Sequence, residues 1–246
     1  MVTYSAFEEE CKAILNDSTQ LDNFRTRRQL GLIVETLSRE QGKSYFKHLK
    51  RYFPQVFDRL ESLTKIDQLG NPAQHQWADS FKSSALMLRY MLQAELLYKY
   101  MGELAQKNIL EIGGGFGGHA AVLQTLYPSA SHTIVDLPAV SQLQSRYLKE
   151  LSINAVTYPY ASPGWQTRKY DIIVSHYCFS ELDASVQDLY MQTIRETPHG
   201  FMICNIINRK SHHKNKIIAW IRAAHPGLKV LDEEPETFRG NYVLVW

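Results

Sequence analysis

The sequence has little cysteine and no marked excess of charge, and each of these features argues against a class of protein. Its three cysteines, Cys11, Cys178 and Cys204, are widely spaced and odd in number, so they predict neither a disulfide framework nor a zinc site. The 27 basic and 25 acidic residues leave a net charge of +2. That balance gives no electrostatic argument for nucleic acid or an anionic membrane as a partner.

Long apolar runs are also absent. The most apolar helix-like segment, residues 85 to 101, is interrupted by polar and charged side chains, so it is too polar and too short to span a bilayer. Three consecutive glutamates at positions 8 to 10 stand where a secretory signal would need an apolar stretch. Together with 44% hydrophobic and 21% charged residues, these features predict a globular cytoplasmic protein.

The chain divides into two parts of different character. Up to about residue 105 the apolar residues recur at helical spacing, as in Leu30, Ile33, Val34 and Leu37, with few strand-like runs. From residue 106 to 246, short β-like runs alternate with helices, which favours a mostly parallel sheet covered on both faces. We therefore expect an N-terminal helical cap or lid (1–105) and an α/β catalytic domain (106–246).

The second part predicts seven strands. They are expected near residues 108–112, 132–136, 154–158, 171–175, 201–207, 228–234 and 241–246. The last two are joined by a segment, PETFRG, that is too short for a crossover helix, so this pair is expected to be antiparallel. The predicted fold is a Rossmann-like α/β sheet that ends in an antiparallel hairpin.

A glycine-rich loop gives the strongest local signal. The segment from Glu111 to Gly118, EIGGGFGG, follows a strand and opens a helix. Gly113, Gly114 and Gly115 allow a sharp turn and a close approach of backbone to ligand, and the free amides at a helix start suit an anionic group. The loop alone leaves two cofactors open, because its glycines also satisfy the dinucleotide pattern GxGxxG.

Two acidic residues lie near the loop, and one of them distinguishes these cofactors. Asp136 ends the second predicted strand, where an acid can accept hydrogen bonds from ribose hydroxyls of either cofactor. Glu111, just before the glycines, is typical of methyltransferases, in which it helps to hold the methionine end of S-adenosyl-L-methionine. The terminal hairpin also matches the class I methyltransferase plan. We therefore predict S-adenosyl-L-methionine as cofactor, with Leu137 and Ser175 completing its binding site.

The fourth predicted strand leads into a second group of polar residues. The segment SHYCFSEL, residues 175 to 182, leaves the sheet at the carboxyl ends of the strands, where ligands bind in open α/β sheets. It contains His176 and Glu181, either of which could take a proton from an acceptor hydroxyl. A divalent cation that holds a sugar diol is a second possibility, but His212 and His213 are adjacent and do not naturally converge, so no metal site is predicted.

Several motifs together resemble a known family. They are LGNP (69–72), LRY (88–90), LEIGGGFGG (110–118), IVDLP (134–138), SHYCFSEL (175–182), QDLY (187–190) and CN (204–205). The sequence is similar in these segments to the bacterial sugar O-methyltransferases, over about residues 67 to 207. The resemblance implies methyl transfer to a hydroxyl of a sugar or related small molecule. Arg89 and Tyr90, on the last long helix before the sheet, and Asn205, at the end of the fifth strand, are the candidate substrate-binding residues.

The resemblance also bears on the catalytic base. Members of the family usually carry Asn at the position of His176 and Ala at that of Cys178, so Glu181 is the preferred base and His176 an assisting group. Two other functions stay open at this point: a nicotinamide-dependent oxidoreductase, and a catalytically inactive protein that keeps the fold as a binding module. The oligomeric state also stays open.

Overall fold

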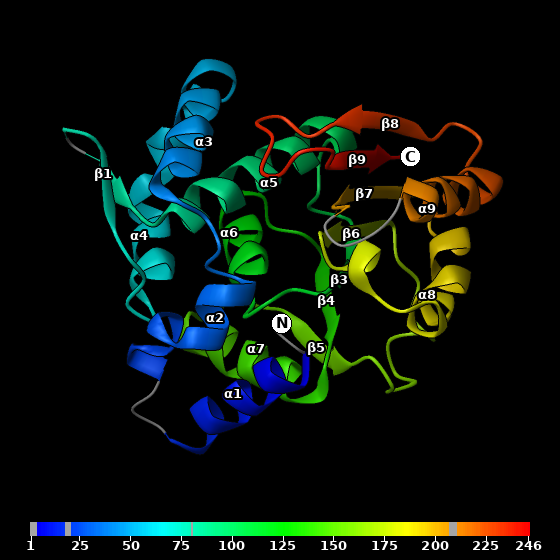
Figure 1. Ribbon diagram of the computed structural model, residues 1–246, viewed down its shortest axis with the longest axis horizontal. Helices are drawn as coiled ribbons and strands as arrows, with labels where there is room; N and C mark the ends of the chain where they lie inside the picture. Colours follow the sequence, from blue (N-terminus) through cyan, green and yellow to red (C-terminus); the bar gives the residue numbers. More distant parts are fainter. Residues whose placement is uncertain (1–3, 18–20, 80, 207–210) are drawn as a thin grey trace.

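The fold is built on a seven-stranded sheet, drawn at the centre of the computed structural model (Figure 1), which describes residues 4–17, 21–79, 81–206 and 211–246. The strands are β3 (Asn108–Ile112), β4 (Ser131–Asp136), β5 (Val156–Pro159), β6 (Ile172–His176), β7 (His199–Cys204), β8 (Lys229–Asp232) and β9 (Tyr242–Val245). Their order is β5-β4-β3-β6-β7-β9-β8. All pairs are parallel except those of β9, which runs antiparallel to β7 and to β8.

The sheet confirms the predicted fold class. Each of the seven expected strands is present, and the last two form the antiparallel pair inferred from their short connection. The parallel strands are buried on both faces, so successive side chains enter different cores. Ile172 and Val174 of β6 belong to one core, whereas Ile173 between them belongs to the other.

Helices cover both faces of the sheet (Figure 1). The first core, with Ile172 and Val174, contains residues of α5 (Ala85–Met101), α6 (Gly118–Leu126) and α7 (Pro138–Glu150). The second core, with Ile173, contains residues of α8 (Ala184–Glu196) and α9 (Ser211–Ala224). The parallel strands therefore all end at one edge of the sheet, in the loops that lead into the helices, and ligands of such folds bind at this edge.

The N-terminal part extends the first core. It consists of α1 (Tyr4–Asn16), α2 (Arg28–Ile33), α3 (Arg39–Tyr52), α4 (Leu60–Gln68) and short 3-10 turns. Phe7, Leu30 and Leu49 from these helices share one buried cluster with the sheet residues Ile109 and Val174. A boundary at residue 105 stays a prediction, since apolar packing continues across it.

One N-terminal feature was not predicted. The strands β1 (His75–Ala78) and β2 (Phe81–Ser83) form an antiparallel pair, separate from the main sheet. The end of α4 at Gln68 lies in the DQLGNP segment (67–72) before it, where Gly70 and Asn71 take positive φ angles of 88° and 54°. The long helix α5 ends at Met101, just before Gly102.

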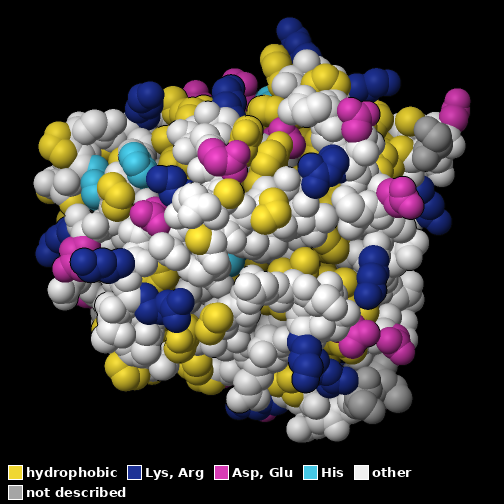
Figure 2. All heavy atoms as spheres, turned by 180° about the vertical axis from the view of Figure 1, so that it is seen from behind, with side chains coloured by type: hydrophobic (Ala, Val, Ile, Leu, Met, Phe, Trp, Pro, Cys, Tyr) yellow, Lys and Arg dark blue, Asp and Glu magenta, His cyan; other side chains and the backbone are white. Residues whose placement is uncertain are grey.

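The surface carries charges of both signs. Figure 2, which views the molecule from behind, shows Lys and Arg side chains interspersed with Asp and Glu on that face. This distribution agrees with the net charge of +2. Among the described residues, no helix combines the length and the apolar character needed to cross a membrane.

Candidate functional site

A cavity of about 570 Å³ lies at the carboxyl ends of the central strands. Its wall contains all the site residues expected from the sequence except Ser175. They are Arg89, Tyr90, Glu111, Gly113, Gly114, Gly115, Asp136, Leu137, His176, Glu181 and Asn205. These residues come from four strand ends and from α5, so the fold gathers segments that are far apart in the chain. A cavity of this size falls within the range of small-molecule sites.

Ser175 has a different place from the one expected. It is fully buried in β6, where its hydroxyl donates to the carbonyl of Ile112 at 2.9 Å and accepts from the amide of Phe179 at 3.0 Å. These bonds tie the glycine strand to the segment that leaves β6. The structure therefore gives Ser175 an indirect part in the site, through the backbone that it holds.

The glycines of the loop have distinct roles. Gly113 and Gly115 have φ angles of 75° and 57°, a region that side chains rarely adopt. A Cβ on Gly113 would lie 2.1 Å from the Cys178 sulfur, so this glycine is required by packing inside the protein. A Cβ on Gly115 would meet only Val34, at 3.5 Å. Gly115 is therefore the glycine of this pair that leaves room in the cavity.

Asp136 ends β4 with its carboxylate on the cavity wall. It accepts hydrogen bonds from the Leu137 amide at 2.8 Å and from the Gln144 side chain at 2.9 Å. Desolvation raises the pKa of Asp136 to about 7, although these hydrogen bonds oppose the rise. The carboxylate is therefore poorly solvated, and hydroxyl donors from a ligand would stabilise its charged form.

Glu111 is held by two histidines that sequence analysis missed. It is 1% exposed, with one carboxylate oxygen 3.0 Å from Nδ1 of His119 and the other 2.8 Å from Nε2 of His132. Burial acts to raise the pKa of Glu111, but the charges and hydrogen bonds of the two histidines outweigh it and lower the pKa well below its usual range. The expected contact with the methionine end of a cofactor stays a prediction, and in this structure both oxygens already have partners.

Arg89 brings a buried positive charge to the cavity. It is 7% exposed, donates to the carbonyl of Val34 at 3.2 Å, and lies with its guanidinium carbon 5.2 Å from the centre of the Tyr177 ring. Among the described residues no carboxylate lies within ion-pair distance of it, and its Nε has no hydrogen-bond partner. A buried cation without a paired anion is well suited to bind an anionic group of a ligand.

Tyr90 lines the cavity but is largely a packing residue. It is 7% exposed, and its ring stands against Gly118, where an added Cβ would come within 2.4 Å of it. Burial raises the pKa of its phenol above the usual range. The ring thus fixes the start of α6 beneath the glycine loop.

The side chains of Glu181 and Asn205 contact each other on the cavity wall. Glu181 lies in a 3-10 turn after β6, and Asn205 directly follows β7. The Asn205 side-chain amide donates to the Glu181 carboxylate, while its backbone amide donates to the Ser180 hydroxyl at 3.1 Å. The structure therefore brings together two residues that the sequence assigned separately to base and substrate binding.

His176, at the end of β6, has both ring nitrogens buried without a partner among the described residues. Burial lowers the pKa of His176 well below its usual range, and the nearby charge of His119 lowers it further. The ring is therefore neutral near pH 7. A neutral imidazole can accept a proton or coordinate a metal ion.

Two segments that sequence analysis did not assign to the site complete the wall. One joins α2 to α3 and contributes Val34 and Thr36, and the other joins β8 to β9 and contributes Thr237 and Phe238. Such loop residues carry no local pattern that marks them as site residues. Only the tertiary fold brings them to the glycine loop.

A hydrogen-bond network fastens the β8–β9 loop beside the cavity. The Tyr177 hydroxyl donates to Glu233, which also accepts from the Thr237 amide at 2.9 Å. Thr237 in turn is bonded to Tyr45 of α3 through their hydroxyls. The C-terminal loop is thus tied to both the N-terminal helices and the end of β6.

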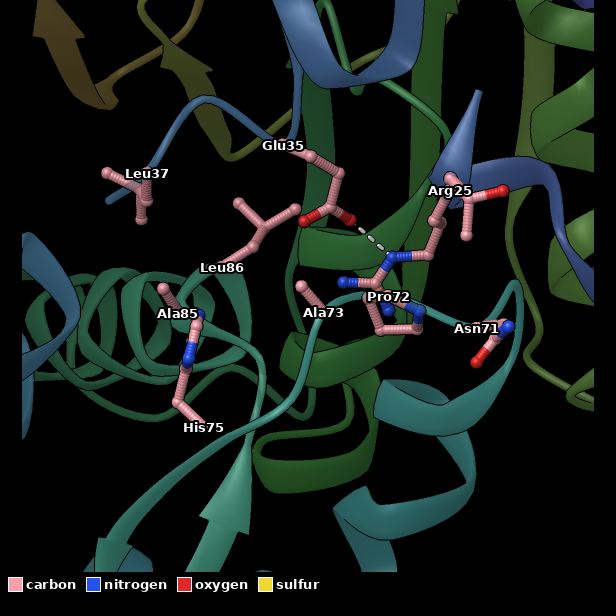
Figure 3. A pocket seen from close by; sticks show the side chains of 10 residues that line it. Arg25, Glu35, Leu37, Asn71, Pro72, Ala73, His75, Ala85 and Leu86 are labelled. Carbon is pink, nitrogen blue, oxygen red and sulfur yellow. Dashed lines mark hydrogen bonds and ion pairs between the residues drawn. The ribbon is translucent and has the colours of Figure 1, made fainter. Parts of the chain in front are cut away.

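A second cavity of about 400 Å³ lies on the other side of the α2–α3 connection (Figure 3). Figure 3 shows Arg25 pointing toward Glu35, with Asn71 and Pro72 of the LGNP motif nearby. Arg25 also donates to the carbonyl of Asp67 at 2.9 Å, so its charge is compensated inside the protein. The LGNP motif therefore borders this second cavity, away from the glycine loop.

This chain is similar to known proteins in its fold. No family model matches the sequence, and no curated protein matches it. Among solved structures, the chain is similar to the PH0226 protein of Pyrococcus horikoshii, with a TM-score of 0.50 and 13% identity over 66% of this chain and 91% of that one. At this identity the likeness concerns the fold alone.

Two further solved structures have lower scores. The methyltransferase domain of a bacterial Hen1 protein has a TM-score of 0.48 and 12% identity, over 64% of this chain and 96% of that one. A geranyl diphosphate C-methyltransferase of Streptomyces coelicolor has a TM-score of 0.49 and 15% identity, over 66% and 79%. The strand order and the antiparallel β9 establish that this chain has the Rossmann-like fold of class I methyltransferases.

Proposed function

We propose that this protein transfers a methyl group from S-adenosyl-L-methionine to a hydroxyl of a small molecule, a sugar or a sugar-containing metabolite. One observation carries the proposal. The glycine loop at Gly113–Gly115 and the carboxylate of Asp136 border a single cavity at the carboxyl ends of β3 and β4, in a sheet with the class I methyltransferase strand order.

The residues of the cavity fit the chemical groups of this cofactor. Asp136 offers an ionisable carboxylate for ribose hydroxyls, and the space beside Gly115 lies next to it on the wall. The uncompensated guanidinium of Arg89 suits the methionine carboxylate or an acidic group of the acceptor. Leu137 adds an apolar contact for the adenosine part.

When bound, S-adenosyl-L-methionine supplies a methyl group on a positively charged sulfur. The chain's residues then have to place an acceptor hydroxyl in line with that methyl and remove its proton. Glu181 is the proposed base, because Asn205 holds its carboxylate on the cavity wall. His176 is the proposed assisting group, with ring nitrogens that could accept a hydrogen bond from the acceptor.

The choice of a hydroxyl acceptor rests on the base and on the family resemblance. An alcohol needs a proton acceptor, and two candidates lie on this wall. The motifs that resemble sugar O-methyltransferases include the segment that carries both of them, residues 175–182. The acceptor is therefore proposed to be a small hydroxylated molecule rather than a nucleic acid or a lipid bilayer.

The proposal is tested by binding and turnover measurements on the full chain. Calorimetry should show one equivalent of S-adenosyl-L-methionine or S-adenosylhomocysteine bound, and no binding of NADH. A panel of sugars and glycosylated metabolites should then yield S-adenosylhomocysteine with at least one acceptor. NADH binding without adenosylmethionine binding would favour an oxidoreductase. Tight cofactor binding without turnover on any acceptor would favour an inactive binding protein.

A further inference from the structure

A cluster of three histidines surrounds Glu111 at the inner wall of the cavity. His119 of α6 and His132 of β4 each bond one carboxylate oxygen, at 3.0 Å and 2.8 Å. His176, at the end of β6, stands edge-on to His119, with ring centres 4.2 Å apart and planes inclined at 84°. Three strands and one helix thus bring four potential ligand side chains together.

Several nitrogens of this cluster are buried without a partner. They are Nε2 of His119 and both ring nitrogens of His176. The His119 side chain lies in the interior, and the residue is only 2% exposed. A buried polar atom without a hydrogen bond costs about 1–3 kcal/mol. Such atoms at a cavity wall therefore indicate that something bound there satisfies them. Among the described residues, only Glu111, His119 and His176 form a group of three metal-ligating side chains that converge in this way.

The donor atoms of these three side chains indicate which kind of ion they would bind. Two imidazoles and a carboxylate bind divalent transition metals such as Zn²⁺ or Fe²⁺. One donor atom from each of the three residues lies within 4.8 Å of the others. Metal–ligand bonds of about 2.0–2.2 Å place the donors of a tetrahedral ion about 3.4 Å apart. The donor atoms therefore have to approach one another by at most about 1.4 Å, which rotation of the side chains could provide.

We propose that Glu111, His119 and His176 bind a divalent transition metal ion, with Zn²⁺ the best match to this donor set. His132 holds the Glu111 carboxylate through a hydrogen bond to its second oxygen. In metal sites, residues outside the coordination sphere orient the ligands in this way. Three protein ligands leave a fourth position, and all three residues line the cavity. A water molecule or an acceptor hydroxyl could occupy that position.

The inference goes beyond the proposed function, because metal binding can be measured without cofactor or acceptor. No local sequence pattern indicates this site, since the only adjacent histidines in the sequence are His212 and His213. The buried positive charge of Arg89 on the same cavity wall opposes a cation. The competing account is a hydrogen-bonded cluster without metal, in which the histidines serve only to hold Glu111.

The experiment uses the full chain, stripped with a chelator and titrated with Zn²⁺ by calorimetry, with metal content checked by mass spectrometry. The wild type should bind one equivalent. His119→Ala and His176→Ala should each weaken binding at least about 100-fold, and His132→Ala by about 10–100-fold. His48→Ala, on α3 and outside the cavity wall, is the matched control and should bind like the wild type.

The variants differ in their risk to folding. The ring of His176 has no hydrogen bond to another described residue, so His176→Ala should keep the fold even where His119→Ala does not. Thermal unfolding of each metal-free variant checks this. Failure of the wild type to bind Zn²⁺, Mn²⁺ or Fe²⁺, or wild-type affinity in a folded His176→Ala, overturns the proposal. Adenosylmethionine binding to metal-free protein tests the proposed function separately.

Discussion

Replacing Asp136 with asparagine should stabilise the protein at alkaline pH and weaken cofactor binding. Desolvation raises the pKa of this carboxyl from an ordinary value of 3.8 to about 7, so the folded protein favours its neutral form. The resulting stabilisation is complete below about pH 4 and is lost as the pH rises through 7. Since each pKa unit corresponds to 1.36 kcal/mol, the ionised group costs about 4 kcal/mol above pH 7.

Asparagine cannot ionise, so Asp136→Asn removes this cost. Its side chain has only one acceptor oxygen, so it keeps one of the two bonds from the Leu137 amide and Gln144, and the donor left facing its NH2 group costs about 2 kcal/mol. The expected net gain is about 2 kcal/mol in the free energy of unfolding at pH 8, and no gain near pH 4. Cofactor affinity at pH 8 should fall about 10- to 100-fold, since charged hydrogen bonds contribute about 1.5–3 kcal/mol.

Urea unfolding at pH 4.5 and pH 8, with calorimetry of cofactor binding at pH 8, measures both effects. Asp171→Asn is the matched control. Asp171 precedes β6 at the opposite end of the sheet, and its carboxylate likewise accepts a backbone and a side-chain amide bond, both from Asn108. That variant should leave cofactor affinity unchanged. The reasoning is refuted if Asp136→Asn binds cofactor like the wild type, or if its stability relative to wild type does not depend on pH.

Four further substitutions test other parts of the site. Gly115→Ala should cost about 1–2 kcal/mol of stability, because of its positive φ, and should reduce cofactor affinity, which calorimetry would measure. Arg89→Met should weaken cofactor or acceptor binding, and an unchanged KM and cofactor Kd would show that its charge faces no ligand. Glu181→Gln should lower turnover roughly 10²–10⁴-fold with little effect on cofactor affinity, and His176→Asn should lower it less. The reverse order in steady-state kinetics would assign the base to His176.

The elements of the fold could be predicted because their signals are local. Alternating strands and helices, the short final connection and the glycine loop each follow from residues close together in sequence. Asp136 was found for the same reason, because it ends a strand next to that loop. The pair of β1 and β2 was missed, since its short strands lack an alternating apolar pattern.

The partners of the site residues could not be predicted in the same way. His119 and His132 lie in a helix and a strand that look ordinary in sequence, and only the packing of α6 and β4 against β3 brings them to Glu111. Cys178 likewise meets Gly113 only because β6 lies beside β3. Long-range contacts of this kind determine the pKa values of the buried groups at the site.

We propose that this cavity binds S-adenosyl-L-methionine, and the simplest test is calorimetric titration of the purified full chain with S-adenosyl-L-methionine, S-adenosylhomocysteine and NADH under identical conditions. We expect one equivalent of either sulfur compound to bind and no heat of binding with NADH. Binding of NADH alone, or binding of none of the three, would contradict it.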